Sequence, residues 1–311
     1  MGVHDPESRL KMMPVAPVSE RANLRAVHMP DSFDDASTDN FRIPYQVVVA
    51  AVRGSWWEAS QIYREWALAE AAWTRAGNLS TRTDIPAWLL RAPLWLRLSG
   101  NDPSSNSTFQ LVDSVKEALG GEGSAVTDIG LHWYSWNQEK FDSHYPIYTP
   151  KPGFRAAVDK MQTPHAGITA RVVPYTNGRI WDKSGPLSAV PDTATCKARN
   201  GTPYHEVYAS KVPFTVMDPA SQFMRDEWST AVANISTKYG TSGVYSDQIS
   251  CSHAEACYTD NKTNASSWAA GSQALLAEMA RKMGPEKGLI SESQDQTMMG
   301  SLHAFLSIYV K

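Results

Sequence analysis

Two acidic side chains, Asp247 and Glu292, lie where short apolar runs give way to polar residues. Asp247 belongs to GVYSDQIS (243–250) and Glu292 to GLISESQ (288–294), and both runs are typical of buried strands. On consecutive parallel strands the two carboxylates would reach one edge of the sheet. Such a pair can cleave a glycosidic bond: one carboxylate attacks or stabilises the oxocarbenium-like centre, and the other, held protonated, gives its proton to the departing oxygen.

These roles would require different environments for the two acids. We expect Asp247 to stay ionised, helped by hydrogen bonds or a cation such as Arg179, and Glu292 to have a raised pKa through burial or the charge of Asp247. A separation of about 5–5.5 Å would indicate retention of configuration, and about 6.5–9.5 Å inversion. A lone acid at a strand end also commonly caps a helix or binds backbone N–H groups, and for Asp247 this alternative stays open.

Other polar and aromatic side chains at predicted strand ends are candidates for sugar binding. Flat apolar rings match the C–H faces of sugars, while amide and guanidinium groups can bond hydroxyls. Because side chains alternate along a strand, at least one of the aromatic residues at 133–136 should pack in the core instead. The predicted substrate-binding set is Trp133, Trp136, Tyr175, Asn177, Arg179, Asp182 and Gln248.

The elements that would position these residues alternate between apolar runs and amphipathic stretches. The pattern predicts strands at 92–100, 127–137, 168–182, 243–250, 288–294 and 303–310, and helices at 108–120, 153–162, about 219–239 and 266–284. This alternation is typical of α/β proteins and favours a (β/α)8 TIM barrel, incomplete at the C-terminus because fewer than eight strands are present. A doubly wound sheet is the rival, but no glycine-rich phosphate loop follows the first strand.

Three regions are expected along the chain. Residues 1–54 should comprise an irregular segment and the last strand of an N-terminal β-sandwich, with that strand at 41–54. Residues 55–90 should form a linking helix and connector, the helix capped by Ser55 with Glu58 three residues on. In this helix, Trp56, Tyr63 and Trp66 form a stripe that we expect to be buried. Residues 91–311 should form the truncated barrel.

Composition narrows the possible partners. The 311 residues are 42% hydrophobic, enough for a full core, and 29 basic against 32 acidic residues offer no basic field for a nucleic acid. No window approaches the roughly 18 apolar residues of a membrane span. The CSHAEAC stretch, with His253 between two cysteines, lacks the spacing of zinc sites, so we expect neither metal nor cofactor.

Cysteines and glycosylation sequons bear on localisation. Cys251 and Cys257 could pair across one loop in an oxidising compartment, and Cys196 would then have no disulfide partner. Six acceptor sequons favour an extracellular, secreted glycoprotein whose signal peptide lies upstream of this chain. The sequons begin at Asn78, Asn106, Asn200, Asn234, Asn261 and Asn264.

Taken in order, GSWWEASQIYREWAL, PAWL, PLWLRLSG, LHWYSWN, VVPYTNGRIWD, GVYSDQIS and ISES resemble a family of mostly uncharacterised glycoside-hydrolase-like proteins. In that family a β-sandwich precedes a TIM barrel, and the barrels are distantly similar to endo-α-N-acetylgalactosaminidases and to retaining α-glycosidases. The resemblance covers about residues 41–311. It implies a nucleophilic aspartate ending the fourth strand, here Asp247, and a proton-donating glutamate ending the fifth, here Glu292.

The resemblance also implies that Tyr175, Asn177, Arg179 and Asp182 line the glycone subsite. Two departures matter: Asp218 stands where a cysteine is expected, and most of the sandwich and the last barrel strands are missing, which puts the activity of this chain by itself in doubt. We therefore predict a glycoside hydrolase that cleaves O-glycosidic bonds of an oligosaccharide or glycoconjugate by a retaining mechanism. The alternative is a barrel of the same shape that binds carbohydrate without cleaving it.

Overall fold

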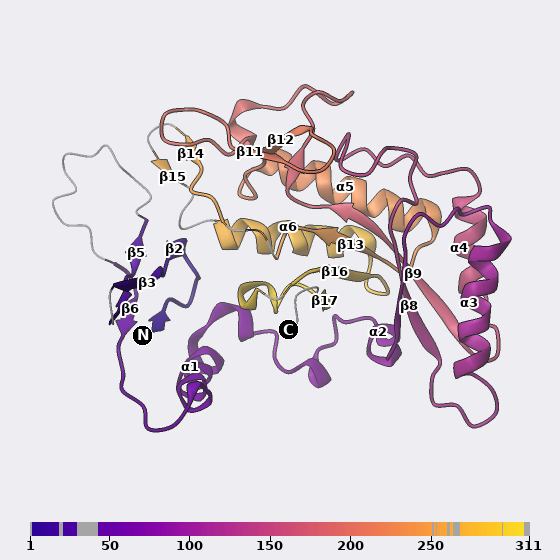
Figure 1. Cartoon of the computed structure of the whole chain (residues 1–311), viewed down its shortest axis with the longest axis horizontal. Coiled ribbons are helices and arrows are strands. Elements are labelled where there is room, and N and C mark those ends of the chain that lie inside the picture. Colours follow the sequence, from indigo (N-terminus) through magenta and orange to yellow (C-terminus); the bar gives the residue numbers. More distant parts are fainter. Residues whose placement is uncertain are drawn as a thin grey trace.

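Six parallel strands curl into half a barrel at the centre of the molecule (Figure 1). The computed structural model describes residues 2–18, 21–29, 43–250, 252, 254–259, 262–263, 268–293 and 295–307. In the sheet each strand lies beside its predecessor in the sequence, which is the order of a barrel and not of a doubly wound sheet. In chain order the strands are β7 (Trp95–Leu98), β8 (Asp128–Trp133), β9 (Thr169–Asn177), β13 (Gly243–Asp247), β16 (Gly288–Glu292) and β17 (Ala304–Leu306).

Four helices connect the strands and pack on one face of the sheet. They are α3 (Asn106–Leu119), α4 (Phe154–Gln162), α5 (Gln222–Tyr239) and α6 (Trp268–Met283). Helix α4 illustrates why: its buried residues Phe154, Ala157, Val158 and Met161 recur at the helical period, so one stripe faces the strands. Helix α5 ends at Gly240, which adopts the left-handed conformation with φ of 66° that glycine tolerates. The main hydrophobic core lies between these helices and the sheet.

The predicted alternation of strands and helices is confirmed, with boundaries displaced by a few residues. The described residues form an open, six-stranded half-barrel. The complete barrel and the sandwich tail stay predictions, as do the domain boundaries.

The N-terminal region differs from the expectation for residues 1–54. Three short antiparallel pairs form there, where residues 1–40 were predicted to be irregular, and the strand predicted at 41–54 is only three residues long. Strands of two to four residues are too short to produce a recognisable alternation. The pairs are β1 (Gly2–His4) with β6 (Gln46–Val48), β2 (Lys11–Met12) with β5 (Val27–His28), and β3 (Val15–Val18) with β4 (Arg21–Leu24).

The predicted linking helix is α1 (Trp56–Glu70), and its capping box of Ser55 and Glu58 is confirmed. The predicted buried stripe is only partly correct, because Trp66 is buried but Trp56 is 77% exposed. Short helices follow, which are η1 (Ala72–Thr74), η2 (Leu79–Thr81) and α2 (Ala87–Arg91). Arg82 donates hydrogen bonds to the carbonyls of Met299 and Leu302, so this region docks on the loop after β16.

An antiparallel excursion after β9 was not predicted. It consists of β10 (Ile180–Trp181), η3 (Asp192–Ala194), β11 (His205–Val207) and β12 (Pro213–Val216), with β12 central in a three-stranded sheet. A disulfide joins Cys196 of this excursion to Cys257, just before the small β14 (Tyr258–Thr259) and β15 (Lys262–Thr263) pair. The Cys251–Cys257 pairing that the sequence allowed is therefore wrong, because Cys257 is bonded to Cys196. Cys251 itself lies outside the described residues.

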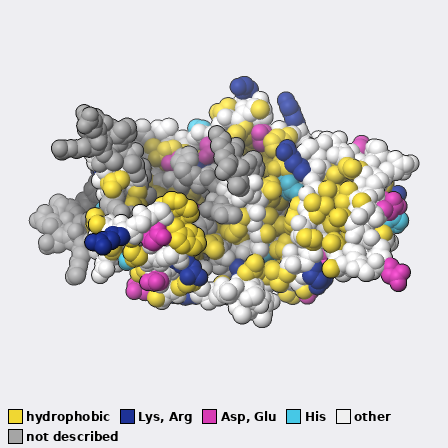
Figure 2. All heavy atoms as spheres, turned by 60° about the horizontal axis from the view of Figure 1, so that its bottom comes forward, with side chains coloured by type: hydrophobic (Ala, Val, Ile, Leu, Met, Phe, Trp, Pro, Cys, Tyr) yellow, Lys and Arg dark blue, Asp and Glu magenta, His cyan; other side chains and the backbone are white. Residues whose placement is uncertain are grey.

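The surface that the bottom of Figure 1 presents is shown in Figure 2. Hydrophobic side chains spread over this face, and basic and acidic side chains are scattered among them without a broad field of one sign. None of the helices in the described ranges is long and apolar enough to span a bilayer.

Candidate active site

Asp247 and Glu292 meet at the carboxyl ends of neighbouring strands. Strands β13 and β16 are parallel, with Tyr245 paired to Ile290, so the two acids, each two residues further on, lie level with one another. Their carboxyl groups share a hydrogen bond. The structure thus brings together the two residues that the sequence predicts as the catalytic pair.

Asp247 has two further hydrogen-bond donors. The hydroxyl of Tyr175 donates to Oδ2 at 2.8 Å, and the backbone N–H of Gln248 donates to Oδ1 at 2.8 Å. Burial, followed by the hydrogen bond and the charge of Glu292, raises the pKa of Asp247 well above its ordinary value, while the bonds from Tyr175 and Gln248 oppose this rise. The expected environment was the reverse, with Asp247 the acid whose ionised form is favoured.

The backbone turns sharply directly after each carboxylate. Gln248 has a φ of 69° and Ser293 a φ of 56°, so both non-glycine residues occupy the left-handed region. Such a conformation costs on the order of 1–3 kcal/mol and persists where the surrounding structure enforces it, often at functional sites. Ser250 contributes by donating its hydroxyl to the carbonyl of Glu292, which ties the two turns together.

Stacked aromatic rings form a wall beside the carboxylates. Tyr175 stacks on Tyr134 with ring centroids 4.9 Å apart and on Tyr245 at 5.8 Å. The guanidinium of Arg97 lies 4.8 Å from the centroid of the Tyr134 ring. Burial and then the charge of Asp247 raise the pKa of Tyr134 to about 12, so this phenol is protonated at neutral pH. Tyr134 is absent from the predicted set, although its position just after β8 was a usable signal.

A buried polar network lies on the other side of Asp247. Asn177 donates from Nδ2 to Oε1 of Gln248 at 2.9 Å, and the side-chain amide of Gln248 donates to the hydroxyl of Tyr208. That hydroxyl donates to Oε2 of Glu206 at 2.6 Å, and Glu206 also forms an ion pair with Nε of Arg179 at 2.9 Å. Arg179 is thus neutralised by Glu206 of the excursion and does not serve as the expected cation for Asp247. Sequence analysis missed Glu206 and Tyr208.

Three residues of the predicted substrate-binding set lie elsewhere. Trp133 and Trp136 have no exposed surface and pack against Phe154 in the core, and the indole N–H of Trp136 donates to the carbonyl of Tyr175 at 2.8 Å. Asp182 is 2% exposed and accepts the backbone N–H of His144 at 2.8 Å, so it holds a loop. The contacts of these three residues lie within the protein, and a sugar contact for them stays a prediction. Tyr175, Asn177 and Gln248 do lie around Asp247.

Metal ligation was not expected from the sequence. Within the described ranges, no group of three or more His, Cys, Asp or Glu side chains is arranged to hold a metal ion. Cys251 and His253 of the CSHAEAC stretch fall outside those ranges. The absence of a metal or cofactor stays a prediction.

A curled parallel sheet with two contacting carboxylates at neighbouring strand ends has the architecture of glycosidase barrels. Residues 41–311 match the family described as domain of unknown function DUF6259, and the chain belongs to this family. The resemblance to glycoside-hydrolase-like proteins is confirmed by two relatives. One, from Bacteroides thetaiotaomicron and named "Putative glycoside hydrolase", is 33% identical over 277 residues, which are 86% of this chain and 38% of that protein.

The second relative, "Putative glycoside hydrolase 22789" from Monosiga brevicollis, is 27% identical over 99% of this chain and 28% of its own length. The chain therefore spans well under half the length of these relatives. Among solved structures, α-N-acetylgalactosaminidase NagBb from Bifidobacterium bifidum in its GalNAc complex has a TM-score of 0.60 at 14% identity, over 78% of this chain and 41% of that enzyme. A GH31 sulfoquinovosidase from E. rectale has a TM-score of 0.51 at 12% identity, over 71% of this chain and 33% of its own. At these identities the likeness concerns the fold.

Proposed function

We propose that this protein is a glycoside hydrolase in which Asp247 is the nucleophile and Glu292 the general acid/base. The observation that carries the proposal is the contact between these two carboxyl groups at the ends of adjacent parallel strands. A binding protein would not require two partly buried acids in contact, one of which disfavours the charge of the other. The names of the relatives, and the glycosidase folds of the structural neighbours, support the same class of reaction.

The geometry supports retention over inversion. Inverting enzymes separate their carboxyl groups by about 6.5–9.5 Å to admit a water, whereas retaining enzymes need about 5–5.5 Å. Two hydrogen-bonded carboxyl groups lie nearer to the second arrangement. In our proposal Glu292 rotates towards the leaving oxygen when the sugar enters, and Asp247, still held by Tyr175 and the N–H of Gln248, attacks the anomeric carbon as an anion.

The remaining polar groups near Asp247 are proposed to bind the sugar. Gln248 presents an amide that the buried Asn177 holds in place, Tyr134 presents a ring and a protonated hydroxyl, and Tyr208 presents a hydroxyl from the excursion. These groups are neutral and arranged on both sides of Asp247, as recognition of sugar hydroxyls requires. An oligosaccharide or glycoconjugate is the proposed substrate class.

Hydrolysis of aryl α- and β-glycosides, including those of galactose and N-acetylgalactosamine, tests the proposal. We expect turnover of one substrate, a loss of at least about 10³-fold in Asp247→Asn, and azide rescue of Asp247→Ala that yields a glycosyl azide of inverted configuration. The first product observed by proton NMR with the unaltered chain should have the configuration of the substrate. Carbohydrate binding without turnover, unchanged in Asp247→Asn and Glu292→Gln, would instead identify a non-catalytic binding barrel.

We also propose that the protein works outside the cytoplasm. The Cys196–Cys257 disulfide supports this, because disulfides persist mainly in oxidising compartments. The sequon asparagines that the structure describes are all exposed, as glycosylation requires; these are Asn78, Asn106, Asn200 and Asn234. Expression through a eukaryotic secretory pathway should give a product whose mass falls after treatment with an N-glycosidase. An unchanged mass would count against the proposal.

A further inference from the structure

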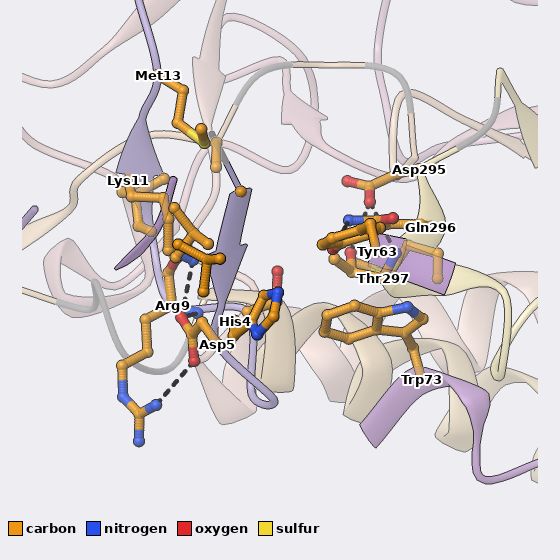
Figure 3. Close-up of a pocket in the computed structure, with 18 of the residues that line it drawn as sticks. His4, Asp5, Arg9, Lys11, Met13, Tyr63, Trp73, Asp295, Gln296 and Thr297 are labelled. Atoms are coloured by element: carbon orange, nitrogen blue, oxygen red, sulfur yellow. Dashed lines mark hydrogen bonds and ion pairs between the residues drawn. The ribbon is translucent and has the colours of Figure 1, made fainter. Parts of the chain in front are cut away.

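A second cavity, of about 610 Å³, lies between the N-terminal strands and the loops that follow β13 and β16 (Figure 3). This volume is within the range of about 300–1,000 Å³ typical of ligand sites. In Figure 3, Asp295, Gln296 and Thr297 occupy one side, and Asp5, Arg9 and Lys11 of the N-terminal region face them across the cavity. Helix α1 contributes Ala59, Ile62 and Tyr63.

The cavity shares its loops with the candidate active site. Ile249 lines it two residues after Asp247, and Asp295 lines it three residues after Glu292. Both loops leave the carboxyl ends of the strands, so the cavity lies at the same end of the half-barrel as the two carboxylates. A chain-like substrate with one sugar at Asp247 and Glu292 could therefore extend into it.

The charged groups in the wall are compensated within the protein. Asp5, only 2% exposed, forms ion pairs with Arg9 at 2.9 Å and Lys11 at 2.7 Å, and Arg9 also pairs with Glu7. Asp295 accepts the backbone N–H and the hydroxyl of Thr297 at 2.8 Å each. A phosphate or sulfate would have to displace an existing ion pair. The wall is therefore suited to an uncharged ligand.

The groups that can contact such a ligand are aromatic rings and neutral hydrogen-bonding side chains. The amide of Gln296 donates to the hydroxyl of Tyr63 at 2.8 Å, so the Tyr63 hydroxyl can still donate its own proton and the amide oxygen of Gln296 can accept a hydroxyl. His4 stacks on Trp66 with ring centroids 4.5 Å apart, which fixes the His4 ring at the wall. Trp73 adds an apolar surface. Rings combined with amide and hydroxyl groups match the C–H faces and hydroxyls of a neutral sugar.

We propose that this cavity is a second sugar subsite, which binds a distal neutral sugar of the glycan whose bond is cleaved at Asp247 and Glu292. The cleavage step in this inference rests on the proposed function, whereas binding of a sugar in the cavity does not depend on turnover. Gln296 and Tyr63 are the contacts that determine recognition, and the N-terminal segment is part of the substrate-binding surface.

Two substrates of different length test the subsite. We compare p-nitrophenyl α-galactoside, which occupies one sugar position, with the tetrasaccharide stachyose, using the full chain. Gln296→Ala removes an exposed amide, and Ala59→Trp fills the cavity from an exposed position of α1. Each should lower kcat/KM for stachyose about 10-fold or more and leave that for the aryl monosaccharide within about twofold. Gln110→Ala, on the exposed side of α3, is the matched control and should change neither value.

Equal losses on both substrates, or no loss on stachyose, would overturn the subsite. If the chain hydrolyses neither substrate, calorimetric titration of stachyose, maltotetraose and other neutral tetrasaccharides into Asp247→Asn separates the two proposals. Binding that Gln296→Ala and Ala59→Trp weaken would support the subsite while the proposed hydrolysis fails. Absence of binding across the panel, or binding that both variants leave intact, would refute the subsite.

Discussion

Tyr175 donates its hydroxyl proton to Oδ2 of Asp247 across 2.8 Å, from the strand that lies directly beside β13. This bond and the N–H of Gln248 favour the ionised carboxylate, whereas burial and Glu292 favour the protonated one. The protonation state of Asp247 therefore depends on a balance: Tyr175 and Gln248 lower its pKa, and Glu292 raises it. Changing either neighbour should move the balance in a known direction.

Tyr175→Phe should lower kcat about 10- to 100-fold, since a hydrogen bond to a charged group contributes about 1.5–3 kcal/mol. Loss of the donor raises the pKa of Asp247 further, so the acidic limb of the kcat/KM profile should move to higher pH. The pH profile on an aryl glycoside provides the measurement. Tyr239→Phe, at the end of α5, is the control and should leave the limb in place. If the acidic limb of the profile does not move in Tyr175→Phe, the hydrogen bond from Tyr175 does not control the pKa of Asp247.

Asp247→Asn should stabilise the protein at pH 7 while abolishing turnover. The folded-state pKa of Asp247 lies above its unfolded value, so between the two values the folded state binds more protons and stability falls as pH rises. At pH 7 the unfolded chain has released this proton, so the folded state carries a free-energy penalty that asparagine, which does not ionise, removes. We expect the melting temperature to rise by roughly 2–4 °C, or about 1 kcal/mol, at pH 7 and by much less near pH 4.

Thermal unfolding by calorimetry at both pH values provides this measurement, with Asp226→Asn on the exposed surface of α5 as the control. A melting temperature that falls at pH 7 in Asp247→Asn would mean that the carboxylate is a net stabilising group. In that case the balance around Asp247 favours ionisation, as the sequence had led us to expect.

The carboxylate pair could be predicted from the sequence for a simple physical reason. The apolar runs that form β13 and β16 are five residues long, and each ends at its acid. Consecutive parallel strands joined by one helix lie side by side, so their ends coincide without any knowledge of loop structure. Asn177 and Tyr175 on β9 were found by the same reasoning, because β9 pairs with β13 on its other side.

Residues whose environment depends on distant segments could not be predicted in this way. All six residues of β8 are buried, so the alternation of its side chains does not distinguish the barrel interior from the helix-facing side, and the sequence could not show that Trp133 packs against Phe154 of α4. Arg179 is neutralised by Glu206, which belongs to an antiparallel excursion with no periodic signal. Cys196 pairs with a cysteine 61 residues away, a distance over which spacing carries no information.

Trp136→Phe distinguishes a core role from sugar stacking. The substitution removes the indole N–H that donates to the carbonyl of Tyr175 and leaves a smaller ring in a fully buried site. We expect a loss of about 1–3 kcal/mol in the free energy of unfolding, measured in urea, and a KM within about twofold of the unaltered chain. A tenfold increase in KM with an unchanged free energy of unfolding would instead indicate that Trp136 contacts the sugar.

Cys196→Ser should weaken both the fold and catalysis. The disulfide closes a loop with a sequence separation of 61 residues, for which the chain-entropy account gives a stabilisation of about 4 kcal/mol. The loop contains Glu206 and Tyr208, whose bonds to Arg179 and Gln248 hold the polar network beside Asp247. Release of the excursion should therefore raise KM as well as lower the melting temperature. Cys251→Ser is the matched control. If Cys257 is bonded to Cys196, the Cys251→Ser variant should keep the melting temperature and the disulfide-linked peptide map of the unaltered chain. If Cys257 is instead bonded to Cys251, the effects of the two variants would be reversed.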